Sequence, residues 1–135
     1  MCDPSLRAIA GPPALDQIDR LLEELLTLHP QIPPTIRFRL RIAVNEIAAN
    51  IVKHATKGMD RLVNLQMWAL VRDNDIVVAF TDDGIPVPDD LLSREMPHEL
   101  EESGRGIPLA RGVLSLLEYR RADGVNLWTL VSEPF

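Results

Sequence analysis

The sequence predicts an α/β protein, an α+β two-layer sandwich in which helices pack on one face of a mixed, mostly antiparallel sheet. Two observations support this prediction. Apolar residues recur at helical spacing through residues 15–55, and from residue 62 they alternate in the manner of half-buried strands. Short polar turns then join pairs of these strands, which predicts antiparallel hairpins.

Two helices are expected in the first part of the chain. In residues 15–26 the apolar positions lie three and four apart, as in an amphipathic helix of about four turns. Residues 29–34 contain three prolines and form a connector, because proline interrupts the backbone bonding of a helix. The second helix runs from residue 36 to about residue 55, where Lys57 and Gly58 end it.

The strands follow as two hairpins. Residues 62–71 place alternate apolar side chains on one face, namely Val63, Leu65, Met67, Ala69 and Val71. The polar turn 72–75 joins them to a second strand at 76–81. Pro108 begins a helix that carries Leu109, Val113, Leu116 and Leu117, and the turn 122–124 joins strands at 118–121 and 125–131.

An irregular, proline-rich and acidic segment separates the two hairpins. It covers residues 84–103, with a short helix expected around Leu91 to Arg94. Its composition is typical of a lid over a binding site.

Size and composition exclude several classes of protein. With 135 residues, the chain is expected to form a single domain over 1–135, and no apolar run could cross a bilayer. Residues 1–10 lack a signal-peptide pattern, so we expect a cytoplasmic location. The single cysteine, Cys2, excludes an internal disulfide, and a net charge of −6 argues against nucleic acid as the main partner.

Three short motifs carry candidate chemistry, and the first lies on the second helix. Glu46 and Asn50 are four residues apart at the border of the apolar stripe, and Lys53 continues the same line. An acid, an amide and an amine in this arrangement can supply a base, a magnesium ligand and a phosphate-binding cation. The same residues also fit a solvated helix edge.

The other two motifs lie where elements begin or end. Asp82 and Asp83 follow a buried strand and precede Gly84, so one carboxylate can accept a hydrogen bond from the exocyclic amine of adenine. An ordinary Asp-Gly turn has the same sequence. Gly104-Arg105-Gly106 precedes the helix at Pro108, where backbone amides and the helix dipole favour phosphate.

Together, in this order and spacing, the motifs resemble those of the Bergerat-fold (GHKL, histidine kinase-like) ATPases. Residues 44–55 (VNEIAANIVKHA) resemble the N box of that superfamily, and residues 82–87 (DDGIPV) and 103–109 (SGRGIPL) resemble its two glycine boxes. The short lid and total length point within it to the anti-sigma-factor serine/threonine kinases. The resemblance covers nearly the whole chain and implies the histidine kinase-like ATPase fold.

The resemblance also implies roles for individual residues. Glu46 would be the general base, Asn50 the magnesium ligand and Asp82 the carboxylate that binds adenine. The remaining nucleotide-binding positions would be Lys53, Gly84, Gly104, Arg105 and Gly106. The third family motif, a glycine followed by threonines, is replaced here by residues 124–129 (GVNLWT), so Asn126 would take the place of a threonine near adenine.

The function implied is that of an anti-sigma regulatory kinase. Such a protein binds ATP with Mg²⁺, phosphorylates a serine or threonine of an anti-anti-sigma (STAS-type) protein, sequesters a sigma factor and forms a homodimer. A nucleotide-responsive adaptor without phosphoryl transfer would share the motifs. A third alternative is an interaction domain that binds no nucleotide, which would require all three motifs to occur in this order by chance. His54, Trp68 and Trp128 are interpreted as packing residues of the helix and sheet.

Overall fold

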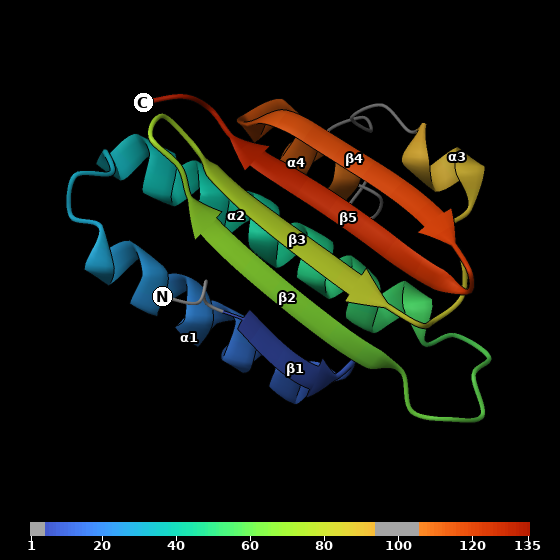
Figure 1. Cartoon of the computed structure of the whole chain (residues 1–135). Coiled ribbons are helices and arrows are strands. Elements are labelled where there is room, and N and C mark those ends of the chain that lie inside the picture. Colours follow the sequence, from blue (N-terminus) through green and yellow to red (C-terminus); the bar gives the residue numbers. More distant parts are fainter. Residues whose placement is uncertain (1–4, 94–105) are drawn as a thin grey trace, which may run out of the picture.

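The computed structural model describes residues 5–93 and 106–135 and has two layers (Figure 1). The sheet order is β1-β2-β3-β5-β4. The elements are β1 (Ser5–Ile9), α1 (Pro12–Leu28), α2 (Pro34–Asn50), the π-helical turn η1 (Ile51–Ala55), β2 (Asn64–Val71), β3 (Ile76–Asp82), α3 (Asp89–Leu92), α4 (Gly106–Val113), β4 (Leu114–Ala122) and β5 (Val125–Ser132). The predicted fold is confirmed, although every strand pairing in the described parts of the chain is antiparallel rather than mixed.

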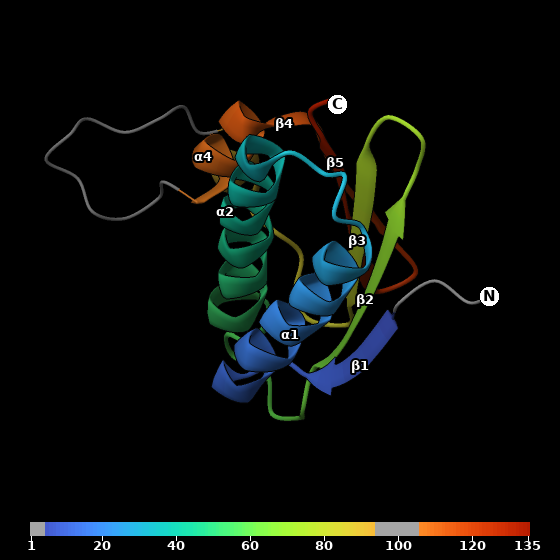
Figure 2. The same ribbon diagram turned by 90° about the vertical axis from the view of Figure 1, so that its left-hand side faces the viewer.

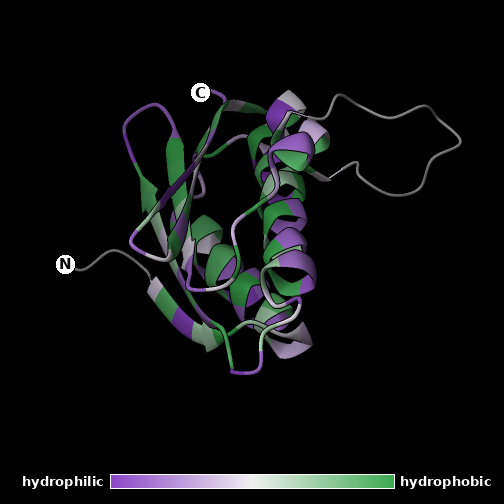
Figure 3. Ribbon diagram, turned by 90° about the vertical axis from the view of Figure 1, so that its right-hand side faces the viewer, coloured by the Kyte–Doolittle hydropathy of each residue, from purple (hydrophilic) through white to green (hydrophobic). Residues whose placement is uncertain are grey.

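The helices α1, α2 and α4 lie on one face of the sheet (Figure 2). The alternation predicted for residues 62–71 directs Leu65, Met67 and Ala69 into the layer between helices and sheet, where all three are buried. Hydrophobic and hydrophilic residues alternate around α2, as expected for a helix with one buried side (Figure 3). No helix among the described residues combines the length and apolar character needed to cross a membrane.

Two elements differ from the prediction. The edge strand β1 was not expected, because only Leu6 and Ala8 of its five residues turn toward the core. Leu116 and Leu117 were assigned to the helix at Pro108 but belong to β4, where they pair with Val131 and Leu130. The helical spacing of these leucines is a local pattern, and it is overridden by their pairing with β5, which depends on residues further along the chain.

The segment predicted as a lid is described only in part. The short helix expected at residues 91–94 is present as α3, Asp89–Leu92. Arg94 and the rest of the segment, to residue 105, lie outside the described residues.

Arg37 joins the end of α1 to the start of α2. Its guanidinium donates hydrogen bonds to the carbonyl oxygens of Leu26, His29 and Ile32, at 2.8, 2.6 and 2.8 Å. Helix carbonyls at a C-terminus have no partner within the helix, and α1 has no basic residue in its last turn to provide one. One side chain of α2 therefore completes the end of α1 and fixes the proline-rich connector.

We expect Arg37→Met to lower the free energy of unfolding by about 2–4 kcal/mol, because three charge-assisted hydrogen bonds are lost. Urea titration followed by circular dichroism measures this change. Arg39→Met is the matched control, since Arg39 lies on the same helix and its ion pair with Glu133 is 43% and 38% exposed. The control should change stability by about 1 kcal/mol or less, and equal losses in the two variants would contradict the role of Arg37.

Candidate nucleotide site

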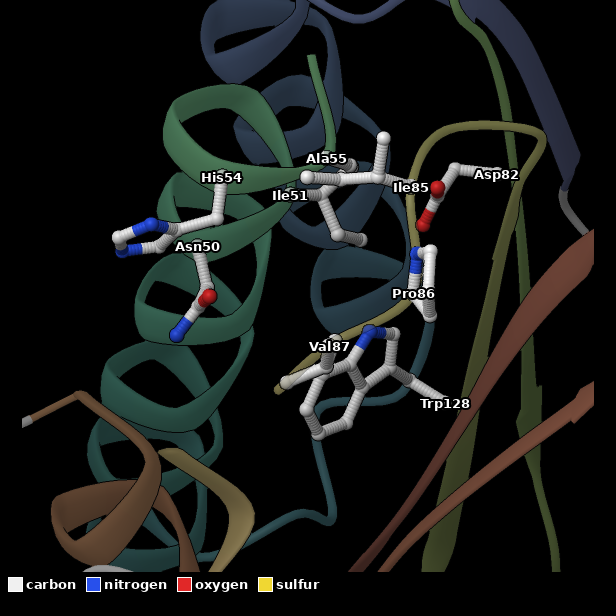
Figure 4. Close-up of a pocket in the computed structure, with 9 residues that line it drawn as sticks. All are labelled: Asn50, Ile51, His54, Ala55, Asp82, Ile85, Pro86, Val87 and Trp128. Atoms are coloured by element: carbon white, nitrogen blue, oxygen red, sulfur yellow. The ribbon is translucent and has the colours of Figure 1, made fainter. Parts of the chain in front are cut away.

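A small pocket lies between the end of α2, the turn η1 and the inner face of the sheet. Its lining residues are Asn50, Ile51, His54, Ala55, Asp82, Ile85, Pro86, Val87 and Trp128. In Figure 4, Asn50 and His54 come from the helical side, Asp82 and Trp128 from the sheet, and residues 85–87 lie between them. The pocket has a volume of about 10 Å³, which is room for about one water molecule.

Asp82 is the buried member of the Asp82-Asp83 pair. It is 2% exposed, and its Oδ1 accepts hydrogen bonds from the Gly84 amide at 3.0 Å and from Asn126 Nδ2 at 2.8 Å. Within the described residues, its Oδ2 is buried without a hydrogen-bond partner. Asp83 instead turns away, and its carboxylate accepts from the backbone and side-chain nitrogens of Asn64.

The electrostatics of Asp82 follow from this burial. Desolvation raises the pKa of the Asp82 carboxyl above its usual value of 3.8, against the opposing effects of the Asn126 and Gly84 hydrogen bonds and the charge of Arg121. The site thus keeps a carboxylate in an apolar setting, with one oxygen held and the other available to a donor.

Asn126 is placed behind Asp82 rather than in the pocket wall. It is fully buried, and its Nδ2 donates to Asp82 and to the carbonyl oxygen of Ile85 at 2.8 and 2.7 Å. Its Oδ1 accepts from the Tyr119 hydroxyl and from Arg121 Nη1, the latter at 2.9 Å. Both ends of the amide are occupied, so in this structure Asn126 orients Asp82 instead of facing a ligand.

The same network holds the segment that forms the pocket wall. The Val87 amide donates to the Tyr119 hydroxyl at 3.0 Å, and Arg121 donates to the carbonyl oxygen of Gly84 at 2.9 Å. With the Asn126 bond to Ile85, three side chains of β4 and β5 fix residues 84–87. Sequence reasoning missed Tyr119 and Arg121, because their contacts depend on the pairing of β4 with β5.

Gly84 brings the end of β3 against the helical layer. A Cβ atom at this position would lie 2.3 Å from the carbonyl oxygen of Ala55, and the Ile85 amide donates to that same oxygen at 2.9 Å. Ala55 ends the π-helical turn η1, where the helical bonding pattern widens. The glycine is therefore required by close backbone contact, and the Asp-Gly sequence is more than a generic turn.

The N-box residues occupy three different surroundings. Glu46 is half-buried and faces the start of α4, since its Oε2 lies 3.0 Å from where a Cβ of Gly106 would be. Asn50, one turn further on, lines the pocket, whereas Lys53 is exposed on η1. The structure thus brings Asn50 and Asp82 to one pocket and places Glu46 beside Gly106, while Gly104 and Arg105 lie outside the described residues.

Two pocket residues were interpreted from the sequence only as packing residues. Trp128 is 1% exposed and its ring lies 4.8 Å from that of Tyr119, yet it also lines the pocket. His54 lines the pocket from the helical side, and its burial, followed by the charges of Lys57 and Lys53, lowers its pKa and favours the neutral imidazole. His54 lies within the N-box stretch 44–55 and Trp128 within residues 124–129, but neither stretch by itself indicates that the side chain lines a pocket.

The described residues fit a magnesium ion that is bound mainly through a nucleotide. Among them, no three histidine, cysteine or carboxylate side chains come together as a metal cluster. Mg²⁺ on a triphosphate needs only one or two protein oxygens, with phosphate and water completing the octahedron. The half-buried amide of Asn50 can provide one such oxygen.

The comparisons with known proteins establish the family. The model of the histidine kinase-like ATPase domain matches residues 10–131. The chain belongs to this family of ATPase domains. No curated protein matches the sequence.

Solved structures share the fold at low sequence identity. One is the histidine kinase domain of a blue-light activated histidine kinase from Erythrobacter litoralis EL346, with a TM-score of 0.58 and 16% identity over 87% of this chain. The present chain spans 59% of that structure. Another is the catalytic domain of histidine kinase ThkA in a nucleotide-free form, with a TM-score of 0.55 and 9% identity over 95% of both chains.

We expect Gly84→Ala to destabilise the protein by about 2 kcal/mol or more, because the added methyl group overlaps the Ala55 carbonyl. Thermal and urea unfolding measure the loss. Gly112→Ala is the matched control, because no atom of the described residues lies within 4 Å of its Cβ position in α4. It should be neutral or gain up to about 1 kcal/mol. A stable Gly84→Ala protein would refute the close-contact argument.

We expect Asp82→Asn to raise the Tm at pH 7, because it removes a desolvated charge while an amide oxygen can still accept from Gly84 and Asn126. The folded-state pKa of Asp82 is raised, so its ionisation opposes folding as the pH rises. The difference in Tm between variant and wild type should therefore shrink as the pH falls through that raised pKa toward 3.8 and below. A difference that does not depend on pH would contradict this account.

Proposed function

We propose that this chain is an ATP-dependent serine/threonine protein kinase of the anti-sigma type. In this proposal it binds ATP with Mg²⁺, phosphorylates a STAS-type anti-anti-sigma protein and sequesters a sigma factor. Membership of the ATPase family supports nucleotide binding, and the motif resemblance supports the narrower activity.

One observation carries the nucleotide part of the proposal. The buried Asp82 Oδ2 lacks a partner among the described residues and lines the same pocket as Asn50. An unpaired buried carboxylate oxygen costs free energy, so its persistence in a pocket is explained by a ligand that donates a hydrogen bond to it. The exocyclic amine of adenine is such a donor, and Asn50 on the opposite wall would then approach the phosphate end through Mg²⁺.

The phosphoryl transfer would use Glu46 and the start of α4. A serine or threonine oxygen of the substrate attacks the γ-phosphorus, its proton passes to the Glu46 carboxylate, and the bond to the β-phosphate oxygen breaks to release ADP. Bound Mg²⁺ would supply charge neutralisation on the phosphates. Gly106 leaves the carboxylate of Glu46 uncovered on that side, since any side chain there would press on Oε2.

The adaptor without catalysis is the second candidate, and one contact favours it. A carboxylate next to the start of a helix stabilises that helix through the backbone dipole, so Glu46 beside Gly106 can have a purely structural role. In that case the chain would hold or release a partner according to the bound nucleotide without transferring phosphate.

The test combines binding and transfer with two variants of α2. Calorimetry with ADP and with ATP and Mg²⁺ measures affinity, and labelled ATP with candidate STAS-type proteins measures transfer. We expect Glu46→Gln to bind ADP within about threefold of wild type and to lose transfer by about 10²- to 10⁴-fold, because only the base is removed. Asn50→Ala should instead weaken the magnesium-dependent part of ATP binding.

Each remaining outcome selects another conclusion. Binding of ATP without transfer to any candidate supports the adaptor, and failure to bind either nucleotide at millimolar concentration rejects the nucleotide site. Asp82→Asn is a useful third variant, since it should lose about 10-fold or more in ADP affinity while remaining folded. Co-purification of the chain with a sigma factor, and its release by the STAS-type protein, would test the proposed partners, and sedimentation would test the homodimer.

A further inference from the structure

Two buried polar atoms, one an acceptor and one a donor, line the same pocket without hydrogen-bond partners in the described part of the chain. Besides Asp82 Oδ2, an acceptor, the indole Nε1–H of Trp128 is a donor that has no hydrogen-bond partner among the described residues. Both side chains are at least 98% buried, since Asp82 is 2% and Trp128 1% exposed. Native proteins rarely leave such groups unpaired, so the coincidence of two in one small pocket indicates a ligand with a neighbouring donor and acceptor.

The indole is held in place by the sheet and by its aromatic neighbour. Trp128 lies on β5 between Phe80 of β3 and Tyr119 of β4 in the strand register. Its ring meets that of Tyr119 at 4.8 Å between centroids and at 53°. Tyr119 is itself fixed by hydrogen bonds to Asn126 and Val87, so the indole is well anchored and its N–H has a defined direction.

We propose that Trp128 determines base specificity, with its Nε1–H donating to the adenine ring nitrogen next to the exocyclic amine while Asp82 accepts from that amine. This inference rests on the proposed nucleotide site and adds a residue to it. Adenine presents an amine donor flanked by the acceptors N1 and N7, which matches this pair of atoms. Guanine presents the acceptor O6 where Asp82 requires a donor, and the guanine N1–H would face the indole N–H of Trp128, so that two donors meet.

Asp82 Oδ2 and Trp128 Nε1 belong to the sheet, whereas residues 85–87, which lie between the sheet and the helical side of the pocket, form a loop (Figure 4). The pocket has room for about one water molecule, so it must widen before a base can bind. The loop 85–87 is the part of its lining that belongs to no helix or strand. Asn126 donates to the Ile85 carbonyl, and the Ile85 and Val87 amides donate to the Ala55 carbonyl and the Tyr119 hydroxyl. Movement of the loop must break these bonds, while Asp82 and Trp128 remain in their strands. A single buried water would satisfy the same two atoms, and it is the competing explanation.

The experiment changes the ligand first, so that it does not depend on any variant folding. Affinities of wild-type protein are measured by calorimetry for ADP, GDP, 1-deaza-ADP and 7-deaza-ADP. One of the two deaza compounds should bind at least about 10-fold more weakly than ADP, because it leaves the indole N–H buried and unpaired. The weaker compound identifies N1 or N7 as the acceptor, and GDP should bind at least about 100-fold more weakly than ADP.

The protein variants then test whether Trp128 is the donor. Trp128→Phe should weaken ADP binding by about 10-fold, the loss expected for the weaker deaza compound with wild-type protein. It should leave the affinity for that deaza compound unchanged, because the compound already lacks the nitrogen that accepts from the indole. Trp68→Phe is the matched control, because Trp68 is 40% exposed on the opposite face of the sheet and should leave all affinities unchanged. In that control protein Trp128 is the single tryptophan, so its fluorescence should respond to ADP.

The possible failures can be told apart. If ADP does not bind, both the nucleotide site and this inference are rejected. If ADP binds but both deaza compounds bind as tightly as ADP, the inference alone is rejected and a buried water is the partner of Trp128. The same conclusion follows if Trp128→Phe weakens ADP and the deaza compounds equally, because the effect is then one of packing.

Discussion

The buried carboxylate of Asp82 is the constraint on which the site depends. An ionised group in an apolar layer is costly, and this protein offsets part of that cost with two hydrogen bonds to a single oxygen, from Asn126 and from the Gly84 amide. Asn126 is in turn held by Tyr119 and Arg121, so the geometry of one carboxylate depends on side chains from three neighbouring strands. The second oxygen has no hydrogen-bond partner among the described residues, so it is available to a ligand that donates a hydrogen bond.

The same carboxylate connects the sheet to the helical layer. Gly84 follows Asp82 by two residues and packs on the carbonyl of Ala55, at the end of the π-helical turn that continues α2. Because Asn50 precedes that turn directly, the amide expected to approach magnesium and the carboxylate expected to bind the base are joined through one backbone contact. A change at this junction would alter both halves of the site together, and it would also reach the wall formed by residues 85–87.

The relation between sequence and structure differs among the site residues. Asp82, Gly84 and Asn50 could be selected from the sequence, because a motif places each at a strand end or on a defined helix face. Asn126 was also selected, but its place behind Asp82 could not be foreseen, since it depends on the register Asp82 to Asn126 between β3 and β5. Tyr119 and Arg121 lie in no motif, and Trp128 lies in residues 124–129, which do not match the glycine and threonines of the family motif. The edge strand β1 was missed because two inward side chains are too few to form a pattern.

The sequence by itself determined the two helices, the two hairpins and the order of the three motifs, because helical and strand periodicity and turn chemistry are properties of neighbouring residues. Only the tertiary structure decided which atoms meet. It assigned Leu116 and Leu117 to β4 rather than to a helix and placed Asn126 behind Asp82. It also brought the indole N–H of Trp128, which has no partner among the described residues, to the pocket that Asp82 lines. These outcomes depend on strand register and on burial, which are fixed by contacts between residues far apart in the chain.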